Sequence, residues 1–173
     1  MEGFTIRPVR TGDGPGIAAI RRMPGVRENI LGFPAERDEA VEEKIKEAGK
    51  SKHQFVAVVR DESGRELIVG TAMLNLFPNP RLRHSAGIGL MVHRDYQGKG
   101  VGSALLKELL DLADLWLMLT RVELTVLSDN EKAIRLYEKF GFKKEGTKRM
   151  AVIRNGEYVD EDVMGRIRNE KGE

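Results

Sequence analysis

The stretch Gln97-Gly98-Lys99-Gly100-Val101-Gly102 decides how this 173-residue chain is expected to fold. Its three glycines let the backbone turn sharply and point several N–H groups in one direction. The N-terminus of a helix carries partial positive charge, so a helix behind this turn suits a phosphate or pyrophosphate group. A flexible turn between a strand and a helix is the structural alternative. Such a helix is predicted over 101–119, because apolar residues recur at helical spacing at Val101, Leu105, Leu109, Leu112 and Trp116.

The glycine-rich stretch differs from two common nucleotide-binding motifs. It is not a Walker A loop, because Lys99 is followed by glycine and not by serine or threonine. Residues 98–103 nearly match the dinucleotide fingerprint G-x-G-x-x-G, and Glu123 lies where a ribose-binding acid is expected. In a dinucleotide-binding fold, however, the glycines follow their strand almost at once, whereas residues 93–96 intervene here. The antiparallel strands predicted before the loop also have no place in that fold, which is kept as a minor alternative.

On either side of the loop, the sequence predicts antiparallel strands first and alternating helices and strands afterwards. Alternating apolar and polar residues indicate strands, and apolar residues three and four apart indicate helices. Before the loop, these patterns predict a strand over 4–9, a short helix that stops at Pro24-Gly25, a helix over 37–50, and strands over 53–60, 66–77 and 85–92. After the helix 101–119, they predict a strand over 121–127, a helix that ends at Phe140, and strands over 142–153 and 158–167. The βαβ part is expected to be a right-handed parallel crossover.

Three local signals refine this outline. Ser128 with Glu131 three residues later fits a capping box and predicts Ser128 as the N-cap of the following helix. Asn155-Gly156 between the last two strands is a strong hairpin signal. Gly87 and Gly89 lie inside the strand 85–92, where interior glycines weaken a strand and mark a close approach to the backbone.

Composition excludes several functional classes. Lys plus Arg is 29 and Asp plus Glu is 27, and the formal charge of +2 excludes a strongly basic nucleic-acid binder. The apolar stretches are too short to span a membrane and no secretion signal opens the chain, so a cytoplasmic location is expected. With no cysteine there is no disulfide, thiolate metal site or cysteine nucleophile, and none of the three histidines has a partner at metal-ligand spacing. The length predicts one domain over 1–168 with a frayed tail over 169–173.

Two blocks of the chain resemble the Gcn5-related N-acetyltransferase (GNAT) family. The family loop reads Gln/Arg-x-x-Gly-x-Gly/Ala, which residues 97–102 match in full, and residues 130–142 (NEKAIRLYEKFGF) match the second block. The resemblance implies an α/β (α+β) fold in which four helices flank a mixed, strongly twisted seven-stranded sheet. It also implies acetyl-CoA as the donor and direct transfer to an amine. Residues 122–126 and 154–160 are similar to a bacterial branch that acetylates free L-amino acids, with ribosomal-protein and polyamine relatives.

The resemblance also assigns roles to single residues. Tyr137 corresponds to the general acid that protonates the departing CoA thiolate, although a half-buried aromatic on a helix is the structural alternative. Asn130 would bond the pantetheine amides, would start its helix, or would do both. The backbone of the strand 85–92 would bond the pantetheine arm like an added strand, and Lys99 would add charge at the pyrophosphate or be solvated. The expected CoA-binding residues are Leu90, Met91, Val92, Gln97, Gly98, Lys99, Gly100, Val101, Gly102 and Asn130.

The sequence leaves the general base and the acceptor contacts open. Glu123 is the expected base that takes a proton from the ammonium, usually through water. A solvated strand glutamate paired with a basic residue is the alternative, and His84 is a weaker candidate. An arginine beside the segment 26–34 (Arg21, Arg22 or Arg27) would clamp the carboxylate of an amino acid, whereas Glu28, Glu36 and Asp38 leave a polycationic acceptor open.

The expected activity is therefore transfer of an acetyl group from acetyl-CoA to a primary amine of a small molecule, a free L-amino acid first. The alternatives are a protein N-terminus, a polyamine, and a module that binds CoA without turnover. No metal, nucleic acid or membrane is expected as a partner. A homodimer is expected from the relatives, and the C-terminal hairpin could pair across its two-fold axis.

Overall fold

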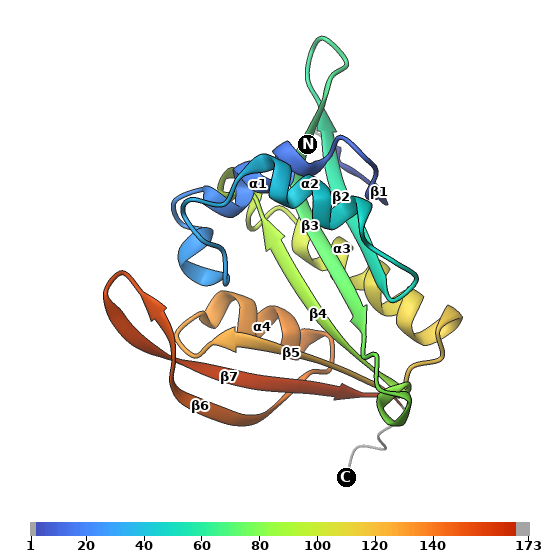
Figure 1. Ribbon diagram of the computed structural model, residues 1–173, viewed down its shortest axis with the longest axis vertical. Coiled ribbons are helices and arrows are strands. Elements are labelled where there is room, and N and C mark those ends of the chain that lie inside the picture. Colours follow the sequence, from blue (N-terminus) through green and yellow to red (C-terminus); the bar gives the residue numbers. More distant parts are fainter. Residues whose placement is uncertain (1–2, 169–173) are drawn as a thin grey trace. The chain divides into compact units, whose positions relative to one another are not determined.

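The computed structural model describes residues 3–168, and its elements follow the order predicted from the sequence. Tail residues 169–173 lie outside the described residues. The strands are β1 Thr5–Pro8, β2 Lys52–Arg60, β3 Glu66–Leu76, β4 Ser85–Val92, β5 Arg121–Leu127, β6 Lys143–Arg154 and β7 Glu157–Ile167. The α-helices are α1 Gly14–Arg22, α2 Asp38–Lys46, α3 Val101–Asp111 and α4 Glu131–Lys139 (Figure 1).

The seven strands form one mixed sheet in the order β1-β2-β3-β4-β5-β7-β6. Pairs β1–β2, β5–β7 and β6–β7 are antiparallel. Strands β4 and β5 are parallel, from Ser85 opposite Arg121 to Gly87 opposite Glu123. The predicted fold class and the parallel direction of the βαβ part are thereby confirmed.

Two compact units make up the described chain. The first runs to Leu74 and includes Gly89–Leu110, and the second contains Asn75–Ile88 and the residues from Asp111 onward. The boundary in β4 therefore falls between Ile88 and Gly89. A single domain over 1–168 stays a prediction.

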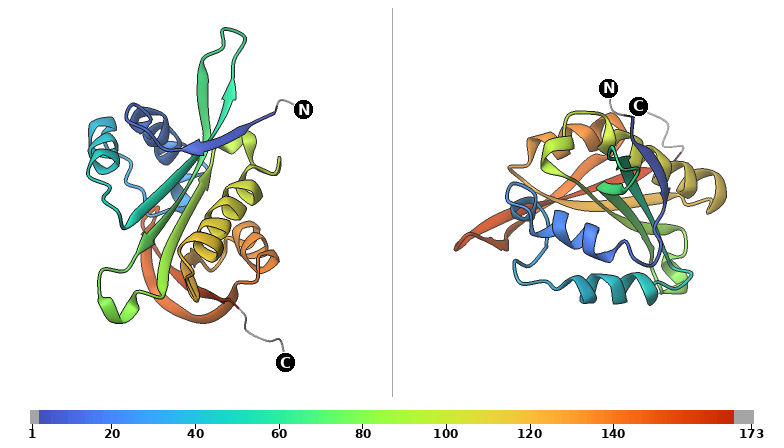
Figure 2. Two further views of the ribbon diagram at one scale, coloured as in Figure 1. Left: turned by 90° about the vertical axis from the view of Figure 1, so that its right-hand side faces the viewer. Right: turned by 90° about the horizontal axis from the view of Figure 1, so that it is seen from above.

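The first unit has helices on both faces of its strands. Helices α1 and α2 cover one face of β2 and β3, and α3 covers the other (Figure 2, left). Consecutive residues 56–59 of β2 are buried, as is typical of strands covered on both sides. The core beneath α1 and α2 includes Ile17, Ile20, Val41, Val56, Val58 and Ile68.

Glycine at position 70 allows α3 to begin close to the sheet. A Cβ atom at Gly70 would lie 2.9 Å from Leu105 Cδ1, 3.1 Å from Val101 Cγ1 and 3.2 Å from the Met91 carbonyl oxygen. These distances are shorter than ordinary van der Waals contacts, so a larger residue would push against the first turn of α3. Gly70 thereby fixes where the glycine loop meets its helix.

The helix predicted over 101–119 ends earlier than the sequence indicates. Its α-helical part stops at Asp111, and a single π-helical turn follows over Leu112–Trp116. In that turn the Leu117 N–H donates to the Leu112 carbonyl at 3.0 Å, and Met118 has a left-handed φ of 52°. The wide turn is held from outside the helix, because Arg166 of β7 donates two hydrogen bonds to Asp114. The apolar spacing alone gives no sign of this tertiary contact.

The N-cap predicted for α4 is wrong by two residues. Asn130, not Ser128, caps the helix, and its side-chain oxygen accepts from the Ala133 N–H at 3.2 Å. Ser128 is bound to β7 instead: its N–H donates to the Asp160 carbonyl and its hydroxyl donates to Asp162 at 2.7 Å. The strand pairing extends one residue past β5, and this moves the helix start along the chain.

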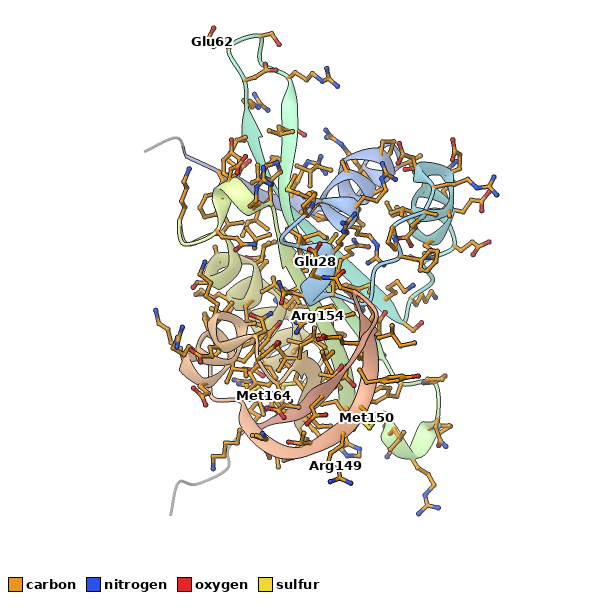
Figure 3. The ribbon with its side chains drawn as sticks, turned by 90° about the vertical axis from the view of Figure 1, so that its left-hand side faces the viewer. Glu28, Glu62, Arg149, Met150, Arg154 and Met164 are labelled. Atoms are coloured by element: carbon orange, nitrogen blue, oxygen red, sulfur yellow. The ribbon has the colours of Figure 1, made fainter. Side chains whose placement is uncertain are left out.

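The hairpin of β6 and β7 turns at Asn155-Gly156, as predicted. Both residues have positive φ angles, 52° and 84°, which a two-residue hairpin turn of this type requires. The β6–β7 register shifts between Lys148 and Val152, where Met150 also adopts a left-handed φ of 52°. Figure 3 shows Arg149 and Met150 on this curved part of β6.

Candidate active site

The glycine loop presents bare backbone in front of α3. Gly98 and Gly100 have φ angles of +75° and +86°, and no heavy atom lies within 4 Å of the position that a Cβ would take at either. Helix α3 follows directly, and its first α-helical hydrogen bond runs from the Ala104 N–H to the Gly100 carbonyl at 3.0 Å. The amides of residues 101–103 therefore have no carbonyl of a preceding turn to bind. This arrangement fits a pyrophosphate, since these amides and the helix dipole face an open space.

Aromatic and amide contacts fix the position of the loop. The Lys99 ammonium lies 5.0 Å from the centre of the Tyr96 ring, and His93 packs edge-on against the same ring. The Gln97 side chain donates to the Val92 carbonyl at 3.3 Å, which ties the loop to the end of β4. The cation–π contact with Tyr96 thus holds the Lys99 side chain next to the backbone of the loop.

The end of β4 leaves part of its surface open. Gly89 is exposed, and nothing lies within 4 Å of the position of a Cβ on it. Met91 is buried in the core, whereas Leu90 and Val92 are half-buried. Bare backbone at Gly89 offers room for an extended ligand alongside the strand.

Tyr137 of α4 is buried, and its hydroxyl has no hydrogen-bond partner among the described residues. The ring packs edge-on against Phe142, with 5.8 Å between the ring centres. Burial raises the pKa of Tyr137 to about 12, because the phenolate is poorly solvated there. The hydroxyl therefore keeps its proton throughout the neutral range and is available to a ligand.

Asn130 uses only part of its hydrogen-bonding capacity. Its oxygen caps α4, and its amide N–H groups donate to none of the described residues. An Asn side chain has two such donors. The helix-starting role is confirmed, and the donors are left for a ligand carbonyl.

Glu123 lies in a three-residue ion-pair cluster. Arg121 donates to Glu123 at 2.8 Å and forms a two-pronged pair with Glu145, at 2.7 and 2.5 Å. The cluster lies over Gly165, where a Cβ would come within 3 Å of Glu145 and Arg121 atoms. The basic partner expected in the structural alternative is therefore present, as an arginine. His84 is exposed, and its carbonyl accepts from the Thr120 and Arg121 N–H groups.

The arginines beside segment 26–34 are all engaged with acids. Arg21 and Lys44 both bind Glu36, Arg22 binds Asp38 at 2.6 Å, and Arg27 binds Glu28 at 3.0 Å. Each acid near this segment is thereby neutralised by at least one basic side chain. Leu31 and Phe33 are exposed.

The sequence analysis missed Asp162, which fixes the junction between β5 and α4. This buried carboxylate accepts from Ser128, which directly follows β5, and from Lys144 and Thr147 of β6. Burial alone would raise the pKa of Asp162, but these three hydrogen bonds hold it below its usual value. The available signal was alternation in β7, which places Asp162 on the same face as the buried Met164.

Two kinds of feature are absent from the described residues. Between residues 3 and 168 no helix has the length and apolar character needed to cross a membrane. The same residues contain no cluster of three or more side chains suited to a metal ion.

The fold is that of an acyltransferase that uses acetyl-CoA. Residues 24–142 match the family model described as "Acetyltransferase (GNAT) family", and the chain belongs to that family. One relative is the L-amino acid N-acetyltransferase AaaT of Escherichia coli K12, 36% identical over 97% of this chain and 100% of the relative. Another is the spermidine N(1)-acetyltransferase of Vibrio cholerae, 28% identical over 91% of this chain and 88% of the relative.

Solved structures show the same fold. The spermidine N-acetyltransferase from Vibrio cholerae, in complex with CoA and spermine, superposes with a TM-score of 0.80 at 26% identity, over 95% of each chain. A GCN5-related N-acetyltransferase from Kribbella flavida gives a TM-score of 0.78 at 26% identity, covering 96% of this chain and 98% of that one. The predicted family and seven-stranded architecture are confirmed.

Proposed function

We propose that this enzyme transfers the acetyl group of acetyl-CoA to the α-amino group of a free L-amino acid. The observation that carries the proposal is the 36% identity to an L-amino acid N-acetyltransferase along nearly the whole of both chains. A polyamine acceptor is the second candidate, since the spermidine N(1)-acetyltransferase is also a relative.

The ion pairs around segment 26–34 weaken the case for a polyamine acceptor. A polycation would need uncompensated carboxylates, whereas Glu28, Glu36 and Asp38 each have a basic partner. The two basic partners of Glu36, together with Coulombic attraction, keep its pKa below the usual value although burial acts the other way. Arg21 and Lys44 thus compensate the negative charge of Glu36, which attracts a polyamine only weakly.

On this proposal, the loop and the end of β4 bind acetyl-CoA, and the family resemblance assigns a further contact to Asn130. The amides of Gly98, Gly100 and residues 101–103 would bind the pyrophosphate, with Lys99 adding positive charge. Gln97 would support the loop through Val92, and the backbone of Leu90, Met91 and Val92 would bond the pantetheine arm. The free amide donors of Asn130 would bond a pantetheine carbonyl.

In the proposed reaction, the neutral amine attacks the carbonyl carbon of the thioester. The C–N bond forms and the C–S bond breaks. Tyr137 would donate its proton to the departing thiolate, and solvent would restore the proton. Because burial raises the pKa of Tyr137 to about 12, the phenol keeps this proton at neutral pH. No covalent intermediate on the enzyme is needed, which agrees with the lack of cysteine.

Glu123 is the proposed general base, through water. Glu123→Gln is expected to lower kcat by about 100-fold at neutral pH. The loss should shrink as pH rises toward the pKa of the amine, because the acceptor then sheds its proton without help. The measurement is the pH profile of kcat for the variant and the wild type.

The matched control is Glu145→Gln, which removes the other carboxylate bound by Arg121. If both variants lose the same factor at every pH, the ion-pair cluster is structural and Glu123 is not the base.

Release of CoA thiol, followed with a thiol reagent, tests the acceptor class. The purified protein would receive acetyl-CoA with each of the L-amino acids, with spermidine, or with a ribosomal N-terminal peptide. A chain without cysteine adds no thiol background, so even slow turnover is measurable. We expect release with a small set of amino acids and none with spermidine.

Other outcomes of this assay point to other acceptors. Release with spermidine alone would replace the amino acid by a polyamine. Silence across the panel, with acetyl-CoA still bound in calorimetry, would favour a protein acceptor or a CoA-binding module without turnover.

We further propose a cytoplasmic homodimer with no nucleic-acid or membrane partner. The formal charge of +2 supports the absence of a nucleic-acid partner. The exposed apolar residues on the surface support self-association.

A further inference from the structure

Helix α4 lies between two contacts to a single buried side chain. Asp162 of β7 is 4% exposed, and its Oδ1 atom accepts from the Ser128 hydroxyl at 2.7 Å. The Lys144 ammonium lies 2.9 Å from Oδ2 of the same carboxylate. Ser128 comes shortly before α4, and Lys144 comes shortly after it, in the first turn of the chain into β6. The carboxylate therefore closes residues 128–144, which contain the whole helix and which we call the α4 segment.

The strand pairing explains how one side chain reaches both ends of the α4 segment. Strand β7 lies between β5 and β6, and Asp162 is opposite Val126 of β5 and Thr147 of β6. The chain enters α4 from β5 and leaves it into β6. A backbone contact adds to the first end, because the Ser128 N–H donates to the Asp160 carbonyl at 3.0 Å.

The first end of the α4 segment leads directly to Asn130. The Asn130 N–H donates to the Leu127 carbonyl at 2.9 Å, in a turn that contains Ser128. The side-chain oxygen of Asn130 accepts from the Ala133 N–H at 3.2 Å and caps the helix. The position of Ser128 therefore decides where the cap and its amide donors lie.

The second end of the α4 segment leads back to Tyr137. The Tyr137 carbonyl accepts from the N–H groups of Phe140 and Phe142, at 3.0 and 3.1 Å. Phe142 is 2% exposed and packs edge-on against the Tyr137 ring. Lys144 follows this anchored aromatic residue, so its contact with Asp162 holds the chain on which the tyrosine rests.

A charged group is an expensive way to fill this place in the sheet. An apolar side chain of similar size would avoid the desolvation penalty of a buried carboxylate. Asp162 instead has three donors, because the Thr147 hydroxyl also binds its Oδ1 atom at 2.7 Å. A buried polar cluster with a full set of partners fixes distances and directions that apolar packing leaves free.

We propose that Asp162 is a positioning residue for acetyl transfer, which holds Asn130 and Tyr137 in place by closing both ends of the α4 segment. The inference rests on the proposed function, since it takes Tyr137 as the proton donor and Asn130 as a pantetheine contact. Asp162 itself touches neither substrate. It acts through Ser128 at one end of the segment and Lys144 at the other.

Stabilisation of the sheet alone is the competing role, and Thr147 distinguishes the two. Its hydroxyl and that of Ser128 donate to the same oxygen of Asp162, each at 2.7 Å. Thr147 lies on β6, outside the α4 segment. Removal of either hydroxyl takes an equivalent hydrogen bond from the carboxylate, but only removal of the Ser128 hydroxyl releases the start of α4.

Ser128→Ala with Thr147→Val as its matched control tests the proposal. Both variants are expected to lower the melting temperature, since each removes one hydrogen bond to a buried charge. Ser128→Ala should lower kcat by about 10-fold, because a small displacement of a reacting group is costly, and leave the KM for the acceptor nearly unchanged. Thr147→Val should keep the wild-type kcat. Equal losses of kcat in the two variants, or wild-type kcat in Ser128→Ala, would overturn the positioning role.

The same substitution in a Tyr137→Phe background tests whether Ser128 acts through Tyr137. Once the phenol hydroxyl is absent, its misplacement has no further cost. The loss of kcat caused by Ser128→Ala should therefore shrink from about 10-fold to about 2-fold or less. Independent effects would multiply instead, so an undiminished loss in the double variant contradicts the proposal.

Failure of the proposed reaction is recognised separately from failure of this inference. A wild-type protein that acetylates no amine contradicts the proposed function, and the positioning role is then read from acetyl-CoA affinity and from hydrogen exchange at the Ala133 amide, which Asn130 caps. Ser128→Ala should weaken acetyl-CoA binding by about 5-fold and speed this exchange, whereas Thr147→Val should change neither. Wild-type affinity and exchange in Ser128→Ala would show that Asp162 does not position the helix.

Discussion

Tyr137→Phe is expected to lower kcat by about 100-fold or more, with acetyl-CoA affinity nearly unchanged. The substitution removes only the hydroxyl, whose proton would go to the departing thiolate. The ring keeps its edge-on contact with Phe142, so the packing around α4 is preserved. Steady-state kinetics with calorimetric binding of acetyl-CoA separates the loss of turnover from any loss of affinity.

The matched control is Tyr158→Phe, which removes the hydroxyl of an exposed tyrosine on the hairpin. Its kcat should equal that of the wild type. Unchanged turnover in Tyr137→Phe would remove this residue from the reaction and leave it as a packing residue.

The raised pKa of Tyr137 adds a prediction on pH for the same experiment. Burial moves the pKa from 10.0 to about 12, so the protonated phenol is favoured in the folded state. The corresponding stability is complete below pH 10 and is lost as pH rises from 10 toward 12. Wild-type turnover should therefore show no fall from loss of the Tyr137 proton between pH 7 and pH 10. A fall in that window that disappears in Tyr137→Phe would show that the phenol ionises earlier.

Gly100→Val is expected to weaken acetyl-CoA binding by about 100-fold or more. Gly100 has a φ of +86°, which a β-branched residue avoids, and the open space at its Cβ position is where the pyrophosphate is proposed to lie. Valine would therefore both strain the loop and fill the space. Calorimetric titration with acetyl-CoA measures the effect.

Gly64→Val is the control for backbone strain. Gly64 lies in the turn between β2 and β3, beside Glu62 at the tip shown in Figure 3, with a φ of +79° and no atom within 4 Å of its Cβ position. Both variants should lower the melting temperature by a similar amount, whereas only Gly100→Val should lose acetyl-CoA. Wild-type affinity in Gly100→Val would mean that the glycine loop does not hold the donor.

The fold was predictable where local chemistry decides it. The hairpin at Asn155-Gly156 follows from two residues that tolerate positive φ, and the glycine loop follows from the same property. The strand 85–92 and the strand 121–127 match β4 and β5 to the residue. In each case a short sequence pattern is sufficient to explain the local structure.

Tertiary contacts decided what could not be predicted. Ser128 has the residue type of an N-cap, but the carboxylate of Asp162 takes its hydroxyl. Asp114 has a polar side chain on a helix, and Arg166 of a distant strand holds it in a π-helical turn. These partners are far apart in the sequence, so the spacing of residues within one segment does not predict the contacts.

The candidate site was also predictable only in part. Loop glycines and Tyr137 were identified from sequence blocks, and the structure gives them open space and a free hydroxyl. The pairing of Arg121 with both Glu123 and Glu145 required the register of β5, β6 and β7, which no single segment contains.

The edge strand β6 affects the tendency of the protein to aggregate at high concentration. It is the last strand of the sheet, it runs for 12 residues, and its side chains are mostly exposed, so its outer edge could recruit strands from other molecules. Arg149 is an exposed charged residue on this strand, whereas Lys144 and Lys148 are paired with Asp162 and Glu161 of β7. The register shift before Val152 bends the strand away from the flat geometry that fibrils require. The bend and the exposed charge both oppose extension of the sheet through this edge.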